Sequence, residues 1–159
     1  MPEGAWFWFL SGGAVAACLL AAVRPLLRWQ RARTMRHALA TFRTCREQLE
    51  ARFFDMASRR GIPRGVRWHQ CDFLGPVEFA RDRATGLITA FVSINVSFEA
   101  IPGSDMEDVQ AVGLLRDACA LFHYQHGAWG TGGRALFNMN PHDAVQRLAV
   151  QYEPLPAGR

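Results

Sequence analysis

The side chains best suited to bind a metal are two cysteines and three histidines in the second half of the chain. Cys119, His123 and His126 have the spacing C-x3-H-x2-H, which would place them on roughly one face of a helix. His69 and Cys71 would point the same way from an expected strand. Zinc prefers thiolate and imidazole ligands, but this spacing matches no established zinc finger. We therefore expect no cofactor, with zinc at these five residues as the alternative.

Polar residues of the kinds that act in catalysis are scattered along the chain without the order of a known catalytic motif. A metal-dependent or hydrolytic enzyme would be centred on His123 and His126. No Ser-His-Asp or paired-carboxylate pattern can be read from the spacing, because such sets assemble in space. The other candidates are Asp72, Glu78, Asp117, Asn138 and His142.

A glycine-rich stretch at residues 130–133 stands beside Arg134, where backbone amides could converge on an anion. It lacks the Lys-Ser/Thr pair of a phosphate-binding loop, and a strand rather than a helix is expected to come after it. This stretch is therefore interpreted as a tight turn.

The uncharged run of residues 5–23 would determine where in the cell these residues lie. As a helix rising about 1.5 Å per residue, it would approach the roughly 30 Å thickness of a bilayer's hydrocarbon core. Trp6 and Trp8 at one end and Trp29 at the other would lie at the membrane interfaces. Residues 1–25 are therefore predicted to be a single transmembrane anchor.

The charges that flank this segment predict its orientation. Glu3 is the one charged side chain before it, whereas arginines come after it at five positions. They are Arg24, Arg28, Arg31, Arg33 and Arg36. The positive-inside rule places the rest of the chain in the cytoplasm, at the inner membrane, where the arginines would contact anionic lipid.

A lipid anchor is the alternative to this transmembrane anchor. The residues Val15, Ala16, Ala17 and Cys18 resemble the lipobox of bacterial lipoproteins, in which the cysteine is lipidated and becomes the new N-terminus. The resemblance implies a lipoprotein whose domain lies on the opposite side of the membrane. The uncharged start of the chain and the apolar residues after Cys18 favour the spanning helix instead.

Charge and cysteine usage narrow the class of protein. The net charge is +4, but residues 1–67 hold twelve arginines and four acids (+8), while residues 68–159 hold six arginines and ten acids (−4). The basic character is therefore local and adjoins the apolar segment. The four cysteines form no C-x-x-C pair, which favours reduced thiols in an intracellular compartment.

Residues 26–63 are predicted to form a basic amphipathic connecting helix, because no glycine or proline interrupts it before Gly61 and Pro63. Apolar residues line one face, with Arg46 at the one position where an apolar residue is missing. They are Met35, Leu39, Phe42, Leu49, Phe53 and Met56. This stripe either docks on the downstream domain, which we favour because the heptads are few and broken, or pairs with a second copy in a homodimer.

Residues 64–155 are predicted to form an α+β domain, with a tail at 156–159. Alternation indicates strands at 66–73, 77–81, 87–100 and 134–139, with a hairpin loop at 82–86. A helix is expected from Asp105, capped by Ser104, and a last helix from Pro141 to about Tyr152 after the N-cap Asn140. The result is a small antiparallel sheet with helices on one face.

This order of helix, three strands and helix resembles that of double-stranded-RNA-binding domains. That family contacts phosphates with lysines at the start of its last helix, where this chain has Asp105, Glu107 and Asp108. Acids there would repel RNA. No specific nucleic acid is expected as a partner.

These patterns together favour a membrane-tethered, non-enzymatic interaction or scaffold module at the cytoplasmic membrane surface. Its expected partners are membrane lipid and another protein. Phe91, on the more polar side of its strand, and Trp129, in a turn, are the aromatic residues expected to be exposed to that protein.

Overall fold

The computed structural model describes residues 5–59 and 65–156, and the side chains of residue 23, residues 25–59 and residues 65–156. The chain divides into two compact units, Met1–His37 and Ala38–Arg159. The described part of the first unit is helical, and the second unit contains the end of the same helix and all of the described strands.

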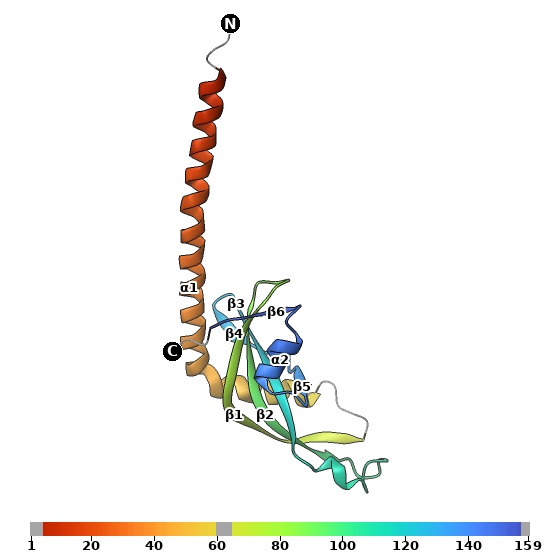
Figure 1. Cartoon of the computed structure of the whole chain (residues 1–159). Coiled ribbons are helices and arrows are strands. Elements are labelled where there is room, and N and C mark those ends of the chain that lie inside the picture. Colours follow the sequence, from red (N-terminus) through yellow and green to blue (C-terminus); the bar gives the residue numbers. More distant parts are fainter. Residues whose placement is uncertain (1–4, 60–64, 157–159) are drawn as a thin grey trace. The chain divides into compact units, whose positions relative to one another are not determined.

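A single helix, α1 (Ala5–Arg59), contains the residues that connect the N-terminal segment to the domain (Figure 1). It continues through Pro25, and the connecting helix predicted from residue 26 is helical to Arg59. Among the side chains that the structure describes, no helix contains a stretch long and apolar enough to cross a membrane. The predicted span at residues 5–23 lies outside them, apart from Val23.

The six strands form one antiparallel sheet, as predicted for an α+β domain. They are β1 (Val66–Asp82), β2 (Ile88–Ala100), β3 (Arg116–Gln125), β4 (Ala128–Gly130), β5 (Ala135–Phe137) and β6 (Tyr152–Pro154). Their order is β4-β3-β2-β1-β6, and β5 also pairs with β3. Both β4 and β5 therefore lie along the same edge of β3, and β6 lies on the outer edge of β1 (Figure 1).

The β1–β2 hairpin confirms the strand at 87–100 and joins the two strands predicted at 66–73 and 77–81 into one. Phe73 pairs with Ile94 and Val77 with Val92, so three residues of β1 stand opposite Ser93 alone. Such a bulge bends the strand locally. The hairpin loop closes where Asp82 Oδ1 accepts hydrogen bonds from the backbone amides of Ala84 and Thr85 (2.8 and 3.1 Å).

The helix predicted from Asp105 is wrong, because turns, a short 3₁₀ segment, η1 (Gln110–Val112), and then β3 occupy that part of the chain. The expected capping box does not form, because Glu107 Oε2 accepts from the Gly103 amide (2.7 Å) and not from that of Ser104, and no α-helix comes after it. Residues 118–122 are buried on both faces of the sheet. A continuous apolar run shows neither the two-residue period of a strand nor the 3.6-residue period of a helix, so the sequence did not identify this segment as a strand. The likeness to RNA-binding domains fails at this point.

The face of the sheet that α1 covers, here called the α1 face, confirms the docking interpretation of the apolar stripe. Phe42, Leu49 and Phe53 are almost fully buried. The Phe53 ring centroid lies 5.7 Å from those of Phe73 and Phe122. A homodimer through these side chains would require them to leave their own sheet.

The opposite face, the α2 face, carries a second core, which corrects the expectation of helices on one face. Phe91 and Leu121 pack there with Val145 of α2 (Pro141–Arg147) and with Tyr152. Asn140 caps α2 as predicted, and its Oδ1 accepts from the Asp143 amide (2.8 Å). The helix stops at Arg147, well before Tyr152, because Tyr152 begins β6 and stacks edge-on against Phe91 at 5.0 Å.

The glycine-rich stretch 130–133 is the end of β4 and part of the connection to β5, and the tight turn of this region lies earlier, at His126 and Gly127. Gly133 has φ of 71°, and a Cβ built there would lie 2.6 Å from the backbone nitrogen of Ala57. Only glycine fits this close approach between the β4–β5 connection and α1. Thr131 Oγ1 holds the connection by donating to the carbonyl of Leu121 (2.9 Å).

Candidate functional site

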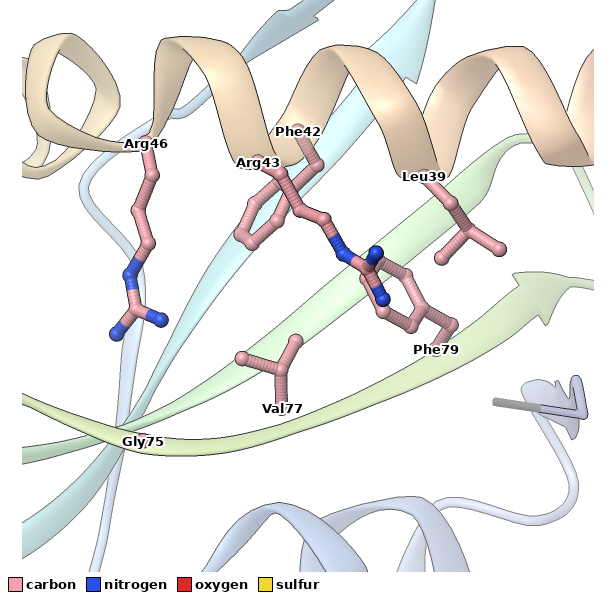
Figure 2. Close-up of a pocket in the computed structure, with 7 residues that line it drawn as sticks. All are labelled: Leu39, Phe42, Arg43, Arg46, Gly75, Val77 and Phe79. Carbon is pink, nitrogen blue, oxygen red and sulfur yellow. The ribbon is translucent and has the colours of Figure 1, made fainter. Parts of the chain in front are cut away.

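A groove lies between α1 and the bulged part of β1, within the unit Ala38–Arg159. Its volume is about 250 Å³. Figure 2 shows its lining, with the helix on one side and the strand on the other. The lining residues are Leu39, Phe42, Arg43, Arg46, Gly75, Val77 and Phe79. Four apolar side chains form its walls, and two arginines extend from α1 toward the strand.

The two arginines have different surroundings. Arg46 Nε is 2.7 Å from Glu50 Oε1, and its terminal nitrogen donates to the Leu74 carbonyl at 2.6 Å. Arg46 therefore links α1 to the bulge of β1. Arg43 is exposed and makes no ion pair or hydrogen bond with any residue in the described part of the chain. The groove thus combines an apolar interior with one guanidinium that has no counter-charge.

The strand beside the groove is also an edge of the sheet. On its outer side β1 pairs with β6 over Ala80–Asp82, and Leu155 N–H donates to the Phe79 carbonyl (2.8 Å). No described strand continues this pairing toward Val77 and Gly75. Unpaired backbone groups at such an edge can accept a further strand.

The five residues predicted to bind zinc do not form one site. Cys119 and His123 lie on β3, not on a helix, and point to the α2 face, while Cys71 lies on the α1 face of β1. His69 is exposed, 3.6 Å from Glu99, and His126 is in the β3–β4 turn. Among the described residues, no three His, Cys, Asp or Glu side chains are grouped to hold a metal.

The surroundings of Cys119, Cys71 and His123 keep these side chains neutral. Burial is the main cause that raises the pKa of both thiols to about 12, far above the range in which a thiolate ligand or nucleophile forms at neutral pH. Burial also lowers the pKa of His123, whose Nδ1 is 3.1 Å from Thr89 Oγ1. In the structure, His123 forms a hydrogen bond that links the neighbouring strands β2 and β3.

The aromatic residues expected to be exposed are buried, so that prediction is wrong. Phe91 is fully buried in the α2-face core. Trp129 packs against Phe42 with a centroid distance of 4.9 Å, and its Nε1 donates to the Ala38 carbonyl at 2.8 Å. Polar neighbours in the sequence suggested exposure, but both faces of this sheet are covered.

The candidate catalytic residues lie on the surface of the domain. Asp117 and Asn138 line an open polar hollow of about 560 Å³ near α2, together with Arg116, Asn140 and Asp143. His142 and Glu78 approach each other at 3.9 Å, and Asp72 accepts from Gln70. The hollow offers oxygens and a guanidinium for water or a polar group, and its lining also includes the hydroxyl of Ser93.

The residues expected to contact the membrane belong to the unit Met1–His37. Arg28, Arg31, Arg33 and Arg36 are exposed, and Arg33 lies 5.6 Å from the ring centroid of the exposed Trp29. The side chains of Trp6, Trp8, Cys18 and Arg24 lie outside the described residues.

The connection before β3 carries a further exposed apolar surface that sequence analysis missed, because a helix was expected there. Leu114 and Leu115 are more than 60% exposed. Met106, Val109 and Val112 line a hollow of about 210 Å³ against the end of the sheet. No basic residue lies between residues 101 and 115.

Sequence analysis also missed the groove, although one signal was visible. Arg46 interrupts the apolar stripe, and it occupies the place where α1 faces the bulge instead of a flat part of the sheet. The open edge of β1 had no signal in the sequence, because it depends on where β6 ends.

Comparisons of the chain with protein-family models, with curated proteins and with solved structures find no match in any of the three.

Proposed function

We propose that this chain is a membrane-tethered, non-enzymatic interaction or scaffold module that presents its α+β domain at the cytoplasmic face of the inner membrane. The observation that carries the proposal is the exposed apolar surface in the part of α1 where the described side chains begin. Leu26 is 54% exposed, Leu27 46% and Trp29 55%. Apolar residues gathered on one helix in this way mark a contact with membrane or protein.

The neighbouring sequence favours a membrane as that contact. Residues 5–23 carry no charge and have the length of a span, and only Arg24 and Pro25 separate them from the exposed leucines. Tryptophan is enriched at membrane interfaces and arginine in the adjoining cytoplasmic segments, and Arg33 lies 5.6 Å from the ring centroid of Trp29. The exposed arginines of α1 would then lie against anionic lipid headgroups.

The same arginines support the cytoplasmic placement of the domain by the positive-inside rule. Lipidation at Cys18 is the competing proposal for attachment, and it would place the domain on the other side of the membrane. The two proposals therefore differ in a property that an experiment can read directly.

The groove beside α1 supports a role in binding another protein. An apolar interior, an exposed guanidinium without a counter-charge and an open strand edge are features of a recognition surface. His123 is bonded to Thr89, and His126 lies in a turn with φ of 50°. No observation favours a hydrolytic site built on these two histidines.

A reporter that is active only outside the cytoplasm, fused after Arg159, tests the placement. We expect no activity from this fusion and full activity from a matched reporter that works only in the cytoplasm. Activity of the outside-only reporter would overturn the placement and favour attachment through Cys18.

The interaction role is tested by chemical crosslinking in intact cells and then gentle solubilisation and purification of the full chain. We expect a second protein to be recovered in a constant ratio. Recovery of this chain alone would contradict the role.

A further inference from the structure

We propose that the groove between α1 and β1 binds an extended segment of another protein, which adds a short strand to the open edge of β1 and places an acidic group at Arg43. The inference rests on the proposed interaction function and deepens it by naming the chemistry of the partner. An extended segment with a large apolar residue next to an aspartate or glutamate would fit the groove.

The edge of β1 supplies the backbone part of this recognition. Phe79 directs its carbonyl outward, where Leu155 donates to it at 2.8 Å. Because backbone groups alternate with a period of two along a strand, Val77 directs its N–H and C=O to the same edge. In the part of the chain that the structure describes, β6 pairs as far as Ala80 with Pro154, and the bond from Leu155 to Phe79 is the last backbone bond on this edge. An added strand would continue from that point.

The bulge limits the length of such a strand. Residues 74–76 stand outside the regular pairing with β2, and Pro76 has no N–H to donate. Backbone pairing next to the groove is therefore confined to a short stretch around Val77. Most of the selectivity must come from the side chains of the added segment.

The apolar part of the groove fits one large side chain. Val77 and Phe79 lie on the strand side, and Leu39 and Phe42 on the helix side (Figure 2). The hollow of about 250 Å³ holds a side chain the size of leucine or phenylalanine. When a peptide adds to a sheet edge, the main-chain hydrogen bonds give affinity, and an apolar pocket of this kind gives specificity for one side chain.

Charge complementarity identifies the neighbouring residue of the partner. Arg43 has no ion pair among the described residues, the lining of the groove contains no carboxylate, and Glu50 is already bonded to Arg46. A carboxylate of the partner would therefore complete the pairing of Arg43, and a basic residue would be repelled. The strand edge favours a polypeptide over a lipid, which has no amides to pair with it.

The test uses the full chain in detergent micelles and two fluorescein-labelled peptides of nine residues. In the first, threonine and valine alternate around a central leucine that precedes a glutamate. The second has lysine in place of the glutamate. The variants are Arg43→Glu and, as a matched control, Arg52→Glu, which reverses the same charge at an exposed position of α1 outside the groove.

We expect the natural chain to bind the glutamate peptide roughly tenfold more tightly than the lysine peptide, the discrimination typical of one charge-assisted contact. Arg43→Glu should reverse this preference, and Arg52→Glu should leave it unchanged. The reversal requires a folded groove, so it cannot result from unfolding. If Arg43→Glu melts at a lower temperature than the natural chain, Arg43→Gln replaces it and should abolish the preference.

Equal binding of both peptides by the natural chain, or an unchanged preference in the Arg43 variants, would overturn the inference. So would displacement of the glutamate peptide by short-chain phosphatidylglycerol, which would assign the groove to lipid. The crosslinking experiment separates this failure from failure of the proposed function. A partner recovered equally with the natural chain and with Arg43→Glu would retain the function and place the interaction elsewhere on the domain.

Discussion

Two stretches of the same helix have opposite surfaces. Between Val23 and Trp29, α1 exposes apolar side chains, whereas between Ala38 and Ala57 it buries them against its own sheet. Both stretches are helical and carry arginines, although the first contains Pro25, so the presence of a helix alone does not explain the difference. The difference shows that the second stretch is part of a domain core, whereas the apolar side chains described in the first stretch are exposed.

The largest loss of stability is expected when an aromatic ring is removed from the buried stretch. Phe53→Ala should lower the free energy of unfolding by about 3–5 kcal/mol, because it leaves a cavity between α1 and the sheet. Leu27→Ala, at an exposed position of the first stretch, should change it by less than about 0.5 kcal/mol. Denaturant unfolding of the full chain in micelles, monitored by circular dichroism, measures both. Equal losses would contradict the division of α1.

A backbone contact offers the next largest effect. Gly133→Ala should cost about 2–4 kcal/mol, because the added Cβ would overlap the backbone of Met56 and Ala57 at a residue with positive φ. Gly132→Ala is the matched control, since a Cβ there meets nothing within 4 Å. Unfolding curves of the two variants compare them directly. A stable Gly133→Ala chain would show that the loop does not press against α1.

The start of the buried stretch can be tested through its hydrogen bond to the sheet. Trp129→Phe removes the donor to the Ala38 carbonyl and should lower stability by about 1–2 kcal/mol. Trp29→Phe makes the same change at an exposed residue and should have almost no effect on unfolding. If the two substitutions cost the same, the contact at Ala38 contributes nothing to the fold.

The smallest expected effect concerns pH and the α2 face of the sheet. Burial lowers the pKa of His123 in the folded chain, so on acidification the unfolded chain takes up this proton first. The resulting stability is fully present above the ordinary histidine pKa of 6.5, and it is lost as pH falls below that value toward the folded pKa. His123→Gln should therefore flatten the decline of the unfolding free energy between pH 7 and pH 5. A decline identical to that of the natural chain would contradict a buried, neutral His123.

The elements with one clear period could be predicted from the sequence. Residues 26–59 have an uninterrupted helical composition, and residues 88–100 alternate in the manner of a strand, so both appear where expected. Residues 118–122 could not be placed, because side chains buried on both faces erase the alternation that distinguishes a strand from a helix. That one error moved Cys119 and His123 onto a helix and produced the predicted metal cluster.

Only part of the candidate groove could be predicted from the sequence. The break in the apolar stripe at Arg46 was visible, and it marks the place where the arginine reaches the Leu74 carbonyl. The exposure of the β1 edge depends on the length of β6, whose three residues carry no distinctive pattern. Long-range pairing of this kind is set by the whole fold and not by local composition.

The most direct test of the proposed tether is whether the full chain stays with the membrane when isolated membranes are washed with high salt and then with alkaline carbonate. A helix that spans the bilayer resists both treatments, whereas arginines held at the surface by charge are released by salt. We predict that the chain remains in the membrane pellet after both washes. Complete release into the supernatant would contradict the tether.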